Sequence, residues 1–201
     1  MSMTDATNTI ADRINQMEKG TIFFPSDFME ISTTDAIRQT LSRMVKKGVI
    51  RRIAQGIYCL PRDNKFLGLE IMPTSDEIAK RIAERDMVKI VPTGDTALNQ
   101  TGLSTQLPAN TVYLTNGARK QIALSNGNKI IFRESNELRI FEFTSRLMML
   151  IVSAMRTIGE NFITDSQIEK LKELLNNVSK PDYNHDIVLA PAWVRRKLES
   201  L

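Results

Sequence analysis

Residues 32–60 constrain the fold of this chain more than any other segment, because they predict a helix followed by a β-hairpin. The segment opens with hydroxyl residues that favour a helix N-cap: Ser32, Thr33 and Thr34. Apolar side chains then recur at helical spacing and form one face: Ile37, Leu41, Met44 and Val45. Two lysines and Gly48 follow, which is the pattern expected at a helix C-terminus.

Two short strands joined by a tight turn are predicted after this helix. The first, at 49–53, is β-branched and basic, and the second covers 57–60, with Ala54-Gln55-Gly56 between them and Pro61 after them. Residues 4–31 precede the main helix as a helix, a short strand and a brief helix, for which Ser26 is the expected N-cap. This order is typical of a winged helix-turn-helix, in which the main helix recognises DNA and the hairpin is the wing.

Positive charge is concentrated in the same region. Residues 38–65 contain eight basic side chains and one acid, which gives a local charge of +7, whereas the whole chain carries only +4. A cationic helix followed by a cationic hairpin is complementary to a phosphate-lined groove and favours binding to DNA. The alternative is an ordinary solvated helix face whose lysines and arginines have no nucleic-acid partner.

The rest of the chain predicts a second module, and therefore an α+β fold class. We expect an N-terminal winged helix-turn-helix domain at residues 1–65 and a larger mixed α+β domain with a helical C-terminal part at 75–201. The boundary region between them, 61–74, contains apolar residues that indicate packing and not a free linker: Phe66, Leu67, Leu69 and Ile71.

Periodicity and turn signals predict the elements of the second domain. Helices are expected at 75–84, with a capping box at 75–78, and at 97–101, 145–158, 165–178 and 192–201. Strands are expected at 88–91, 111–115, 121–124, 129–133 and 138–143. The Asn126-Gly127 turn predicts that the strands on either side of it form a hairpin.

Composition points to the cytoplasm. Cys59 is the only cysteine, so no internal disulfide can form, which favours a reducing compartment. The chain has no apolar run long enough to span a bilayer, and its first residues lack the apolar core of a signal peptide. We therefore expect a cytoplasmic protein with no membrane partner.

The sequence contains no enzyme signature. Cys59 is expected to be buried in the wing, and His185, the only histidine, is expected in a polar loop at 182–186, so the usual four zinc ligands are not available. Residues 92–98 are similar to a phosphate-binding turn but lack the lysine and glycine spacing of a P-loop, which favours Thr93 or Asp95 as a helix cap. We expect no catalytic residue, no cofactor and no metal.

Several blocks of the sequence resemble the AbiEi-type antitoxins of bacterial type IV toxin–antitoxin systems. The first block is residues 41–52 with Gly56-Ile57-Tyr58 and Pro61, and the second is residues 92–99 with 102–105 and the strand at 111–115. The resemblance covers about residues 5–160, and the C-terminal tail departs from it. The first block is shared by many regulators, so the second makes the assignment more particular.

The resemblance implies a protein with two roles. The N-terminal domain of such antitoxins binds operator repeats in double-stranded DNA and represses its own operon. The larger C-terminal domain counters, directly or indirectly, a nucleotidyltransferase-like toxin that is usually encoded next door. The paired aspartates of a nucleotidyltransferase are not visible in this sequence, which suits the antitoxin and not the toxin.

The predicted DNA contacts lie on the main helix and on the wing. Side chains expected to reach base edges are Thr33, Thr34, Arg38, Gln39 and Ser42. Side chains expected to bind phosphates are Arg43, Lys46, Lys47, Arg51 and Arg52, and Gln55 in the turn of the wing completes the predicted DNA-binding set.

Two other functions compete with this interpretation. One is a transcriptional regulator whose second domain senses a ligand or dimerises, with no toxin involved. The other is an interaction protein in which the winged helix binds protein and not DNA. An enzyme is the least favoured class.

Overall fold

The computed structural model describes residues 3–64 and 68–201 and shows a mixed α+β protein. The chain divides into two compact units, one containing the residues up to Ile82 together with Ala123–Gly127, the other Ala83–Ile122 and Asn128–Leu201. Lys65, the last residue of the basic segment, and Phe66 and Leu67, which are expected to pack, lie outside the described residues. The predicted domain ranges, 1–65 and 75–201, stay a prediction.

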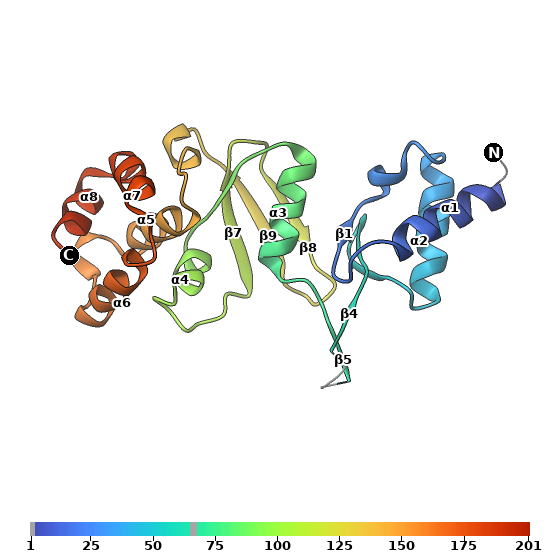
Figure 1. The fold of residues 1–201 in the computed structure, drawn as a ribbon, viewed down its shortest axis with the longest axis horizontal. Helices are drawn as coiled ribbons and strands as arrows, with labels where there is room; N and C mark the ends of the chain where they lie inside the picture. The colour runs from blue at the N-terminus through green and yellow to red at the C-terminus, as the bar shows by residue number, and fades with distance from the viewer. Residues whose placement is uncertain (1–2, 65–67) are drawn as a thin grey trace. The chain divides into compact units, whose positions relative to one another are not determined.

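The first unit combines helices with a small antiparallel sheet (Figure 1). Its elements are α1 (Met3–Asn15), β1 (Ile22–Phe23), the 3-10 helix η1 (Pro25–Phe28), α2 (Thr34–Lys46), β2 (Arg51–Ala54) and β3 (Ile57–Cys59). The strand order is β1-β3-β2, with Ile22 opposite Cys59 and Ala54 opposite Ile57. The predicted hairpin therefore forms, with Gln55 and Gly56 as its two-residue turn.

Aromatic side chains join the helices of this unit to its sheet. Phe23 on β1 stacks on Tyr58 of β3, with ring centroids 6.1 Å apart, and meets Phe28 of η1 edge to face at 5.8 Å. Apolar residues from α1, α2 and the following segment complete one continuous cluster: Ile10, Ile14, Ile37, Leu41, Met44 and Ile50. This core fixes how α2 is rotated about its own axis.

The boundary region contains a second hairpin, which the sequence pattern does not predict. Strands β4 (Arg62–Asn64) and β5 (Leu69–Ile71) pair antiparallel, with Asp63 opposite Glu70. Leu69 is 64% exposed and Ile71 47% exposed, so the expectation that these two side chains pack is wrong. Strand β4 is wholly polar, and β5 alternates apolar and polar residues over only three positions, which is too short for its periodicity to predict a strand.

Helix α3 (Ser75–Asp86) follows and continues across the division between the units. Its cap is one residue earlier than predicted. The Thr74 hydroxyl accepts from the Glu77 backbone N–H at 3.2 Å, and a Glu77 carboxylate oxygen accepts from the Thr74 N–H at 2.7 Å. This reciprocal pair is the capping box, because Thr74 and not Ser75 stands three residues before an acidic side chain that can reach back.

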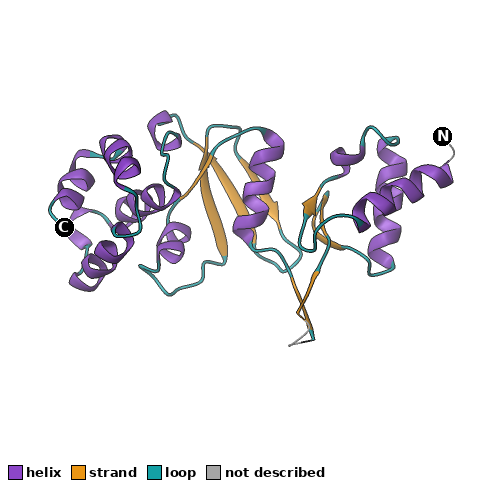
Figure 2. Ribbon diagram, in the orientation of Figure 1, coloured by secondary structure: helices purple, strands orange, loops and turns teal. Residues whose placement is uncertain are grey.

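The second unit has one four-stranded sheet and a helical C-terminal part (Figure 2). Its strands are β6 (Ile90–Pro92), β7 (Asn110–Thr115), β8 (Lys120–Ala123) and β9 (Lys129–Glu134), in the order β6-β7-β9-β8. Strands β7 and β9 are parallel, and Tyr113 stacks on its neighbour Phe132 with centroids 5.8 Å apart. The predicted β8–β9 hairpin forms, and Gly127 in its turn has the positive φ (89°) that favours glycine.

The helices of this unit pack around α5 (Arg146–Ile158). The others are α4 (Asp95–Thr101), α6 (Asp165–Leu175), α7 (Lys180–Asp186) and α8 (Ala192–Glu199), with short 3-10 helices at η2 (Leu138–Phe141), η3 (Glu160–Phe162) and η4 (Ile187–Leu189). Met148, Ile151 and Met155 of α5 form a cluster with Leu171, Val194 and Leu198. Among the described residues, no helix is both long and apolar enough to cross a membrane.

Four further expectations are wrong. Residues 138–141 form a 3-10 helix and not a strand, and 180–186 form a helix where a polar loop was expected. Helix α4 begins after Gly94, whose φ of 60° is a glycine conformation, so neither Thr93 nor Asp95 is its cap. Ser26 lies inside η1, where the Asp27 carboxylate accepts from the Phe24 N–H at 3.0 Å.

The capping geometry at Thr74 leads to a stability prediction with an internal control. Replacing Thr74 with alanine leaves the first turn of α3 without its side-chain acceptor, so the free energy of unfolding should fall by about 1 kcal/mol. Ser75→Ala, one residue away, should change it by less than about 0.5 kcal/mol. Urea denaturation followed by circular dichroism measures both variants, and equal effects would place the cap elsewhere.

Candidate nucleic-acid interface

Helix α2 is half buried and half exposed. Ile37, Thr40, Leu41 and Met44 lie on the buried side, and the Thr40 hydroxyl is 3.3 Å from the hydroxyl of Thr7 on α1. The helix begins after Thr33, the predicted N-cap region, although no side-chain cap hydrogen bond forms there. It ends at Lys46, and Gly48 follows with φ 74°, as expected for a helix stopped by glycine.

The predicted DNA contacts on α2 lie together on its opposite side. The side chains that the structure leaves exposed are Arg38, Gln39, Ser42, Arg43 and Lys46, with Lys47 directly after the helix. At 100° per residue the five helical positions span about 140° of the helix circumference, which is one continuous face. We call these six residues the α2 face.

The cations of the α2 face have no acidic partner in the described part of the chain. Arg38, Arg43, Lys46 and Lys47 make no ion pair and no side-chain hydrogen bond with any described residue. Other arginines in the same unit do have partners: Arg13 with Glu30, Arg51 with Glu70, Arg62 with Glu77 and Arg81 with Asp27. Positive charge left uncompensated on one helix face is available to an external anion.

At the start of α2, the two predicted threonines differ in their surroundings. Thr33 is exposed, whereas Thr34 is partly covered and its hydroxyl contacts the sulfur of Met29 at 3.5 Å. Both stand at the N-terminus of the helix, next to the α2 face. Asp35, also exposed, is the one acidic side chain within α2.

Arg51 makes intramolecular hydrogen bonds that the sequence does not predict. Its guanidinium donates from Nε to Glu70 on β5 at 2.8 Å, forms a second contact with the same carboxylate, and donates to the Gly48 carbonyl at 2.6 Å. Arg51 therefore joins the β4–β5 hairpin to the C-terminal end of α2. The sequence does not indicate Glu70 as a partner of Arg51, because the strand that carries Glu70 is too short to be predicted from its pattern.

The two remaining predicted contacts on the hairpin are exposed. Arg52 donates from Nε to the Ala54 carbonyl at 3.3 Å, and Gln55 stands in the turn. The open edge of β2 is occupied by residues of the 123–127 segment, because the Ser125 N–H donates to the Ile53 carbonyl at 2.7 Å and Leu124 bridges to Ala54. The hairpin is thus held in place close to its turn.

Cys59 is a buried structural residue, as the sequence indicated. Its side chain is fully buried in β3, and burial raises the pKa of the thiol to about 11. The thiolate is the nucleophilic form, so Cys59 is poorly suited to covalent chemistry near neutral pH. In the described ranges, no group of three His, Cys, Asp or Glu side chains is placed to hold a metal ion.

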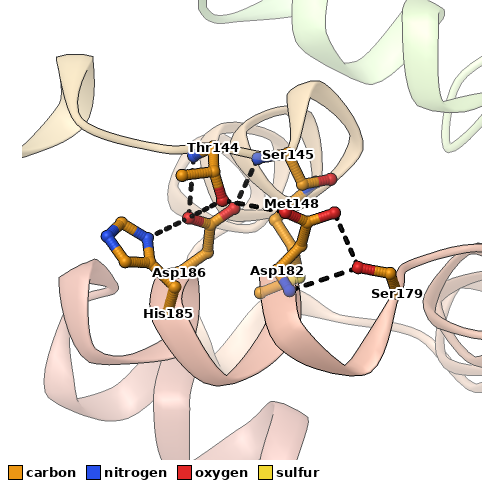
Figure 3. A network of polar contacts seen from close by, with 7 residues as sticks. All are labelled: Thr144, Ser145, Met148, Ser179, Asp182, His185 and Asp186. Carbon is orange, nitrogen blue, oxygen red and sulfur yellow. Dashed lines mark hydrogen bonds and ion pairs between the residues drawn. The ribbon is translucent and has the colours of Figure 1, made fainter.

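A second cluster of polar groups lies between α5 and α7 (Figure 3). The Asp186 carboxylate is fully buried and accepts from the backbone N–H groups of Thr144 and Ser145, each at 2.8 Å. The Thr144 hydroxyl lies 3.0 Å from Asp186 and 3.1 Å from Asp182, and His185 Nδ1 is 2.8 Å from Asp186. His185 is therefore a helical residue with a carboxylate partner and not a loop residue.

This cluster connects α7 to the start of α5, and we call it the α5–α7 joint. The Ser145 hydroxyl accepts from the Met148 N–H at 3.2 Å and caps α5, and the Ser179 hydroxyl likewise caps α7 through Asp182. Asp186 satisfies the backbone donors just before α5, so it fixes where α7 packs. The Ser145 and Ser179 hydroxyls cap helices and the Thr144 hydroxyl lies against two carboxylates, so the contacts of this cluster hold α7 to the start of α5.

The chain belongs to the DUF6088 family, described as a family of unknown function, whose model matches residues 9–183. No curated protein gave a significant match to the sequence. The family match spans both structural units. The α2 face lies wholly within it, whereas the matched range ends just before His185 and Asp186.

The Asp186 cluster gives a pH-dependent prediction. Burial by itself would raise the pKa of Asp186, but hydrogen bonds from His185, Thr144 and Ser145 outweigh it and lower that pKa below its ordinary value of 3.8. A carboxylate with a depressed pKa contributes stability above its unfolded-state value, and that contribution disappears as the pH falls through the folded-state pKa.

Asp186→Asn should therefore lower the free energy of unfolding by about 2 kcal/mol at pH 7. The difference from the wild-type chain should shrink as the pH falls below 3.8. Denaturation curves at several pH values measure it, with Asp165→Asn, an exposed acid in the first turn of α6, as the control. A difference that is independent of pH would show that the charge of Asp186 is not what stabilises the joint.

Proposed function

We propose that this DUF6088 chain is a DNA-binding regulator whose N-terminal elements form a winged helix-turn-helix, with α2 as the recognition helix. The element order supports this assignment, because η1 and α2 follow one another and lead into the β2–β3 hairpin. One observation carries the proposal: four cations without a described acidic partner lie on or directly after the exposed side of α2.

The dimensions of α2 suit a major groove. Thirteen residues give a helix of about 20 Å, and the groove of B-DNA is wide enough to admit an α-helix. Arg38 and Gln39 stand in the N-terminal half of α2, where a recognition helix contacts base edges, with Thr33 and Thr34 ahead of them and Ser42 one turn after Arg38. Arg43, Lys46 and Lys47 stand towards the C-terminus and are assigned to phosphates.

The hairpin residues take different roles in this proposal. Arg52 and Gln55 are exposed and are assigned to the DNA backbone. Arg51 would have to leave Glu70 and the Gly48 carbonyl to reach a phosphate. We therefore assign Arg51 to positioning: it fixes the end of α2 relative to the β4–β5 hairpin.

We further propose that the chain is a cytoplasmic antitoxin that represses its own operon and counters a nucleotidyltransferase-like toxin. The support is the sequence resemblance to AbiEi-type antitoxins, above all residues 92–99, 102–105 and 111–115. In the structure residues 92–99 run from the end of β6 into α4, residues 102–105 follow that helix, and residues 111–115 lie in β7. Ala97 and Tyr113, which belong to these blocks, are fully buried.

A regulator with a ligand-sensing second unit is the competing function, and one observation favours it. A cavity of about 500 Å³ lies within the second unit, between the sheet and α5. This volume falls in the range typical of small-molecule sites. The two functions share the α2 face and differ in what the second unit does.

Substitutions on α2 test DNA binding directly. Arg38→Ala should relax sequence preference at the base pair that it contacts, at a cost of about 1–3 kcal/mol. Lys46→Ala should weaken binding to every sequence and reduce the slope of log K against log salt by about 1. Fluorescence anisotropy with DNA from the promoter of the chain's own operon measures both, and Lys180→Ala, an exposed lysine of α7, should bind as the wild type does. Unchanged binding by both α2 variants would rule out this face.

Co-expression with a nucleotidyltransferase-like protein encoded beside the chain tests the antitoxin role separately. The full chain should restore growth of toxin-arrested cells. A variant that lacks the four cations of the α2 face (Arg38, Arg43, Lys46 and Lys47 all changed to Ala) should lose repression of a promoter reporter, because phosphate contacts are removed. If the second unit counters the toxin, that variant should still restore growth. Repression without any rescue by the full chain would instead support the regulator without a toxin.

A further inference from the structure

We infer that the cavity of the second unit binds a small organic anion that has an apolar or aromatic body and at least one N–H or O–H donor. This inference does not depend on DNA binding or on the antitoxin role. It rests on how the charged, hydroxyl and apolar groups are distributed around a cavity of about 500 Å³.

The apolar wall comes from one face of the sheet. Val112 and Leu114 of β7 line the cavity, whereas Tyr113 between them is fully buried and stacks on Phe132. Successive side chains of a strand point to opposite faces, so Val112 and Leu114 share the cavity side. Phe143, which is partly buried, adds an aromatic surface to the lining. A flat or branched apolar body would remove this surface from water.

Arg133 supplies a positive charge at the same site. It is the neighbour of Leu114 in the parallel β7–β9 pair, it lines the cavity, and its side chain is exposed. No described residue forms an ion pair or side-chain hydrogen bond with it. Its guanidinium is therefore available for bidentate contact with a carboxylate or phosphate.

Arg156 is a second guanidinium in the lining, and it is held in place. It donates to both carboxylate oxygens of Glu137, at 3.1 and 2.7 Å. Its charge is thus largely balanced, which leaves Arg133 as the main attraction for an anionic group. The lining thus offers one guanidinium without a described acidic partner, which suits a ligand with a single anionic group.

The hydroxyls along α5 select for a donor on the ligand. Ser153 donates its hydroxyl hydrogen to the Pro92 carbonyl, and Thr157 donates its own to the Ser153 carbonyl at 2.9 Å. Both residues line the cavity, and because their hydroxyl hydrogens are committed, these hydroxyls can only accept from a ligand. The exposed carboxylate of Asp95 is a further acceptor in the lining.

Two pairs of probes test this chemistry on the full chain by isothermal titration calorimetry. Adenosine monophosphate and 2-aminobenzoate each combine an acidic group, an aromatic body and an amino donor, and adenosine and 2-aminobenzamide are their neutral counterparts. At least one anion should bind with 1:1 stoichiometry, about tenfold or more tightly than its neutral counterpart, because a charge-assisted hydrogen bond is lost in the neutral form. Which anion binds distinguishes a phosphate from a carboxylate ligand.

Arg133→Gln should weaken binding of that anion about tenfold, whereas Arg196→Gln, an exposed arginine of α8 outside the cavity lining, should leave it unchanged. Methyl NMR of the same titration should show shifts at Val112, Leu114 and Val152. The inference is overturned if neither anion is preferred over its neutral form, if Arg133→Gln binds normally, or if the shifts appear around α2. None of these readouts uses DNA, so the inference and the proposed function can fail separately.

Discussion

Burial of Ile37, Leu41 and Met44 in the core of the first unit fixes the rotation of α2, and the proposed function depends on that rotation. Because three apolar side chains and Thr40 occupy one side, the residues between them must face outwards. Arg38, Ser42 and Lys46, spaced by four residues, are thereby placed along one exposed line. A rotation of the helix by about one residue, or 100°, would bury charge and expose the core residues.

The basic residues of the first unit fall into two groups. Some have acidic partners and hold the unit together, and others face outwards without a described acidic partner. Arg81 shows the first group: it donates to Asp27 at 3.1 Å and to the Ile22 carbonyl at 3.2 Å, and its guanidinium lies over the Phe24 ring. Arg51 joins α2 to the β4–β5 hairpin in the same way. The cations on the α2 face belong to the second group, because no described acid compensates them. Desolvating them against an anionic partner would therefore break no ion pair within the described chain.

The sequence predicted the long periodic elements well. Helix α2, helix α5 and the strands on either side of Asn126-Gly127 were found because their patterns repeat over several residues or contain a specific turn dipeptide. The buried state of Cys59 was also predicted correctly. These features depend on local sequence and on burial of one face.

The sequence did not predict features that depend on tertiary contacts. Helix α7 contains Pro181 and a run of polar residues, and it is fixed by Asp186 binding backbone groups some forty positions earlier, which no local pattern shows. The pairing of Arg51 with Glu70 needed the unpredicted β4–β5 hairpin. The cavity beside Arg133 arises only where β7, β9 and α5 come together, so its residues could not be grouped from their order in the chain.

The salt dependence of binding to DNA from the chain's own promoter tests the central claim most directly. If the four cations of the α2 face contact phosphates, log K should fall linearly with log salt, with a slope of roughly −3 to −4 per bound chain. An unrelated duplex of equal length should bind more weakly and retain a similar dependence. Binding that does not change with salt, or no binding at low salt, would contradict the assignment of α2 as a DNA-recognition helix.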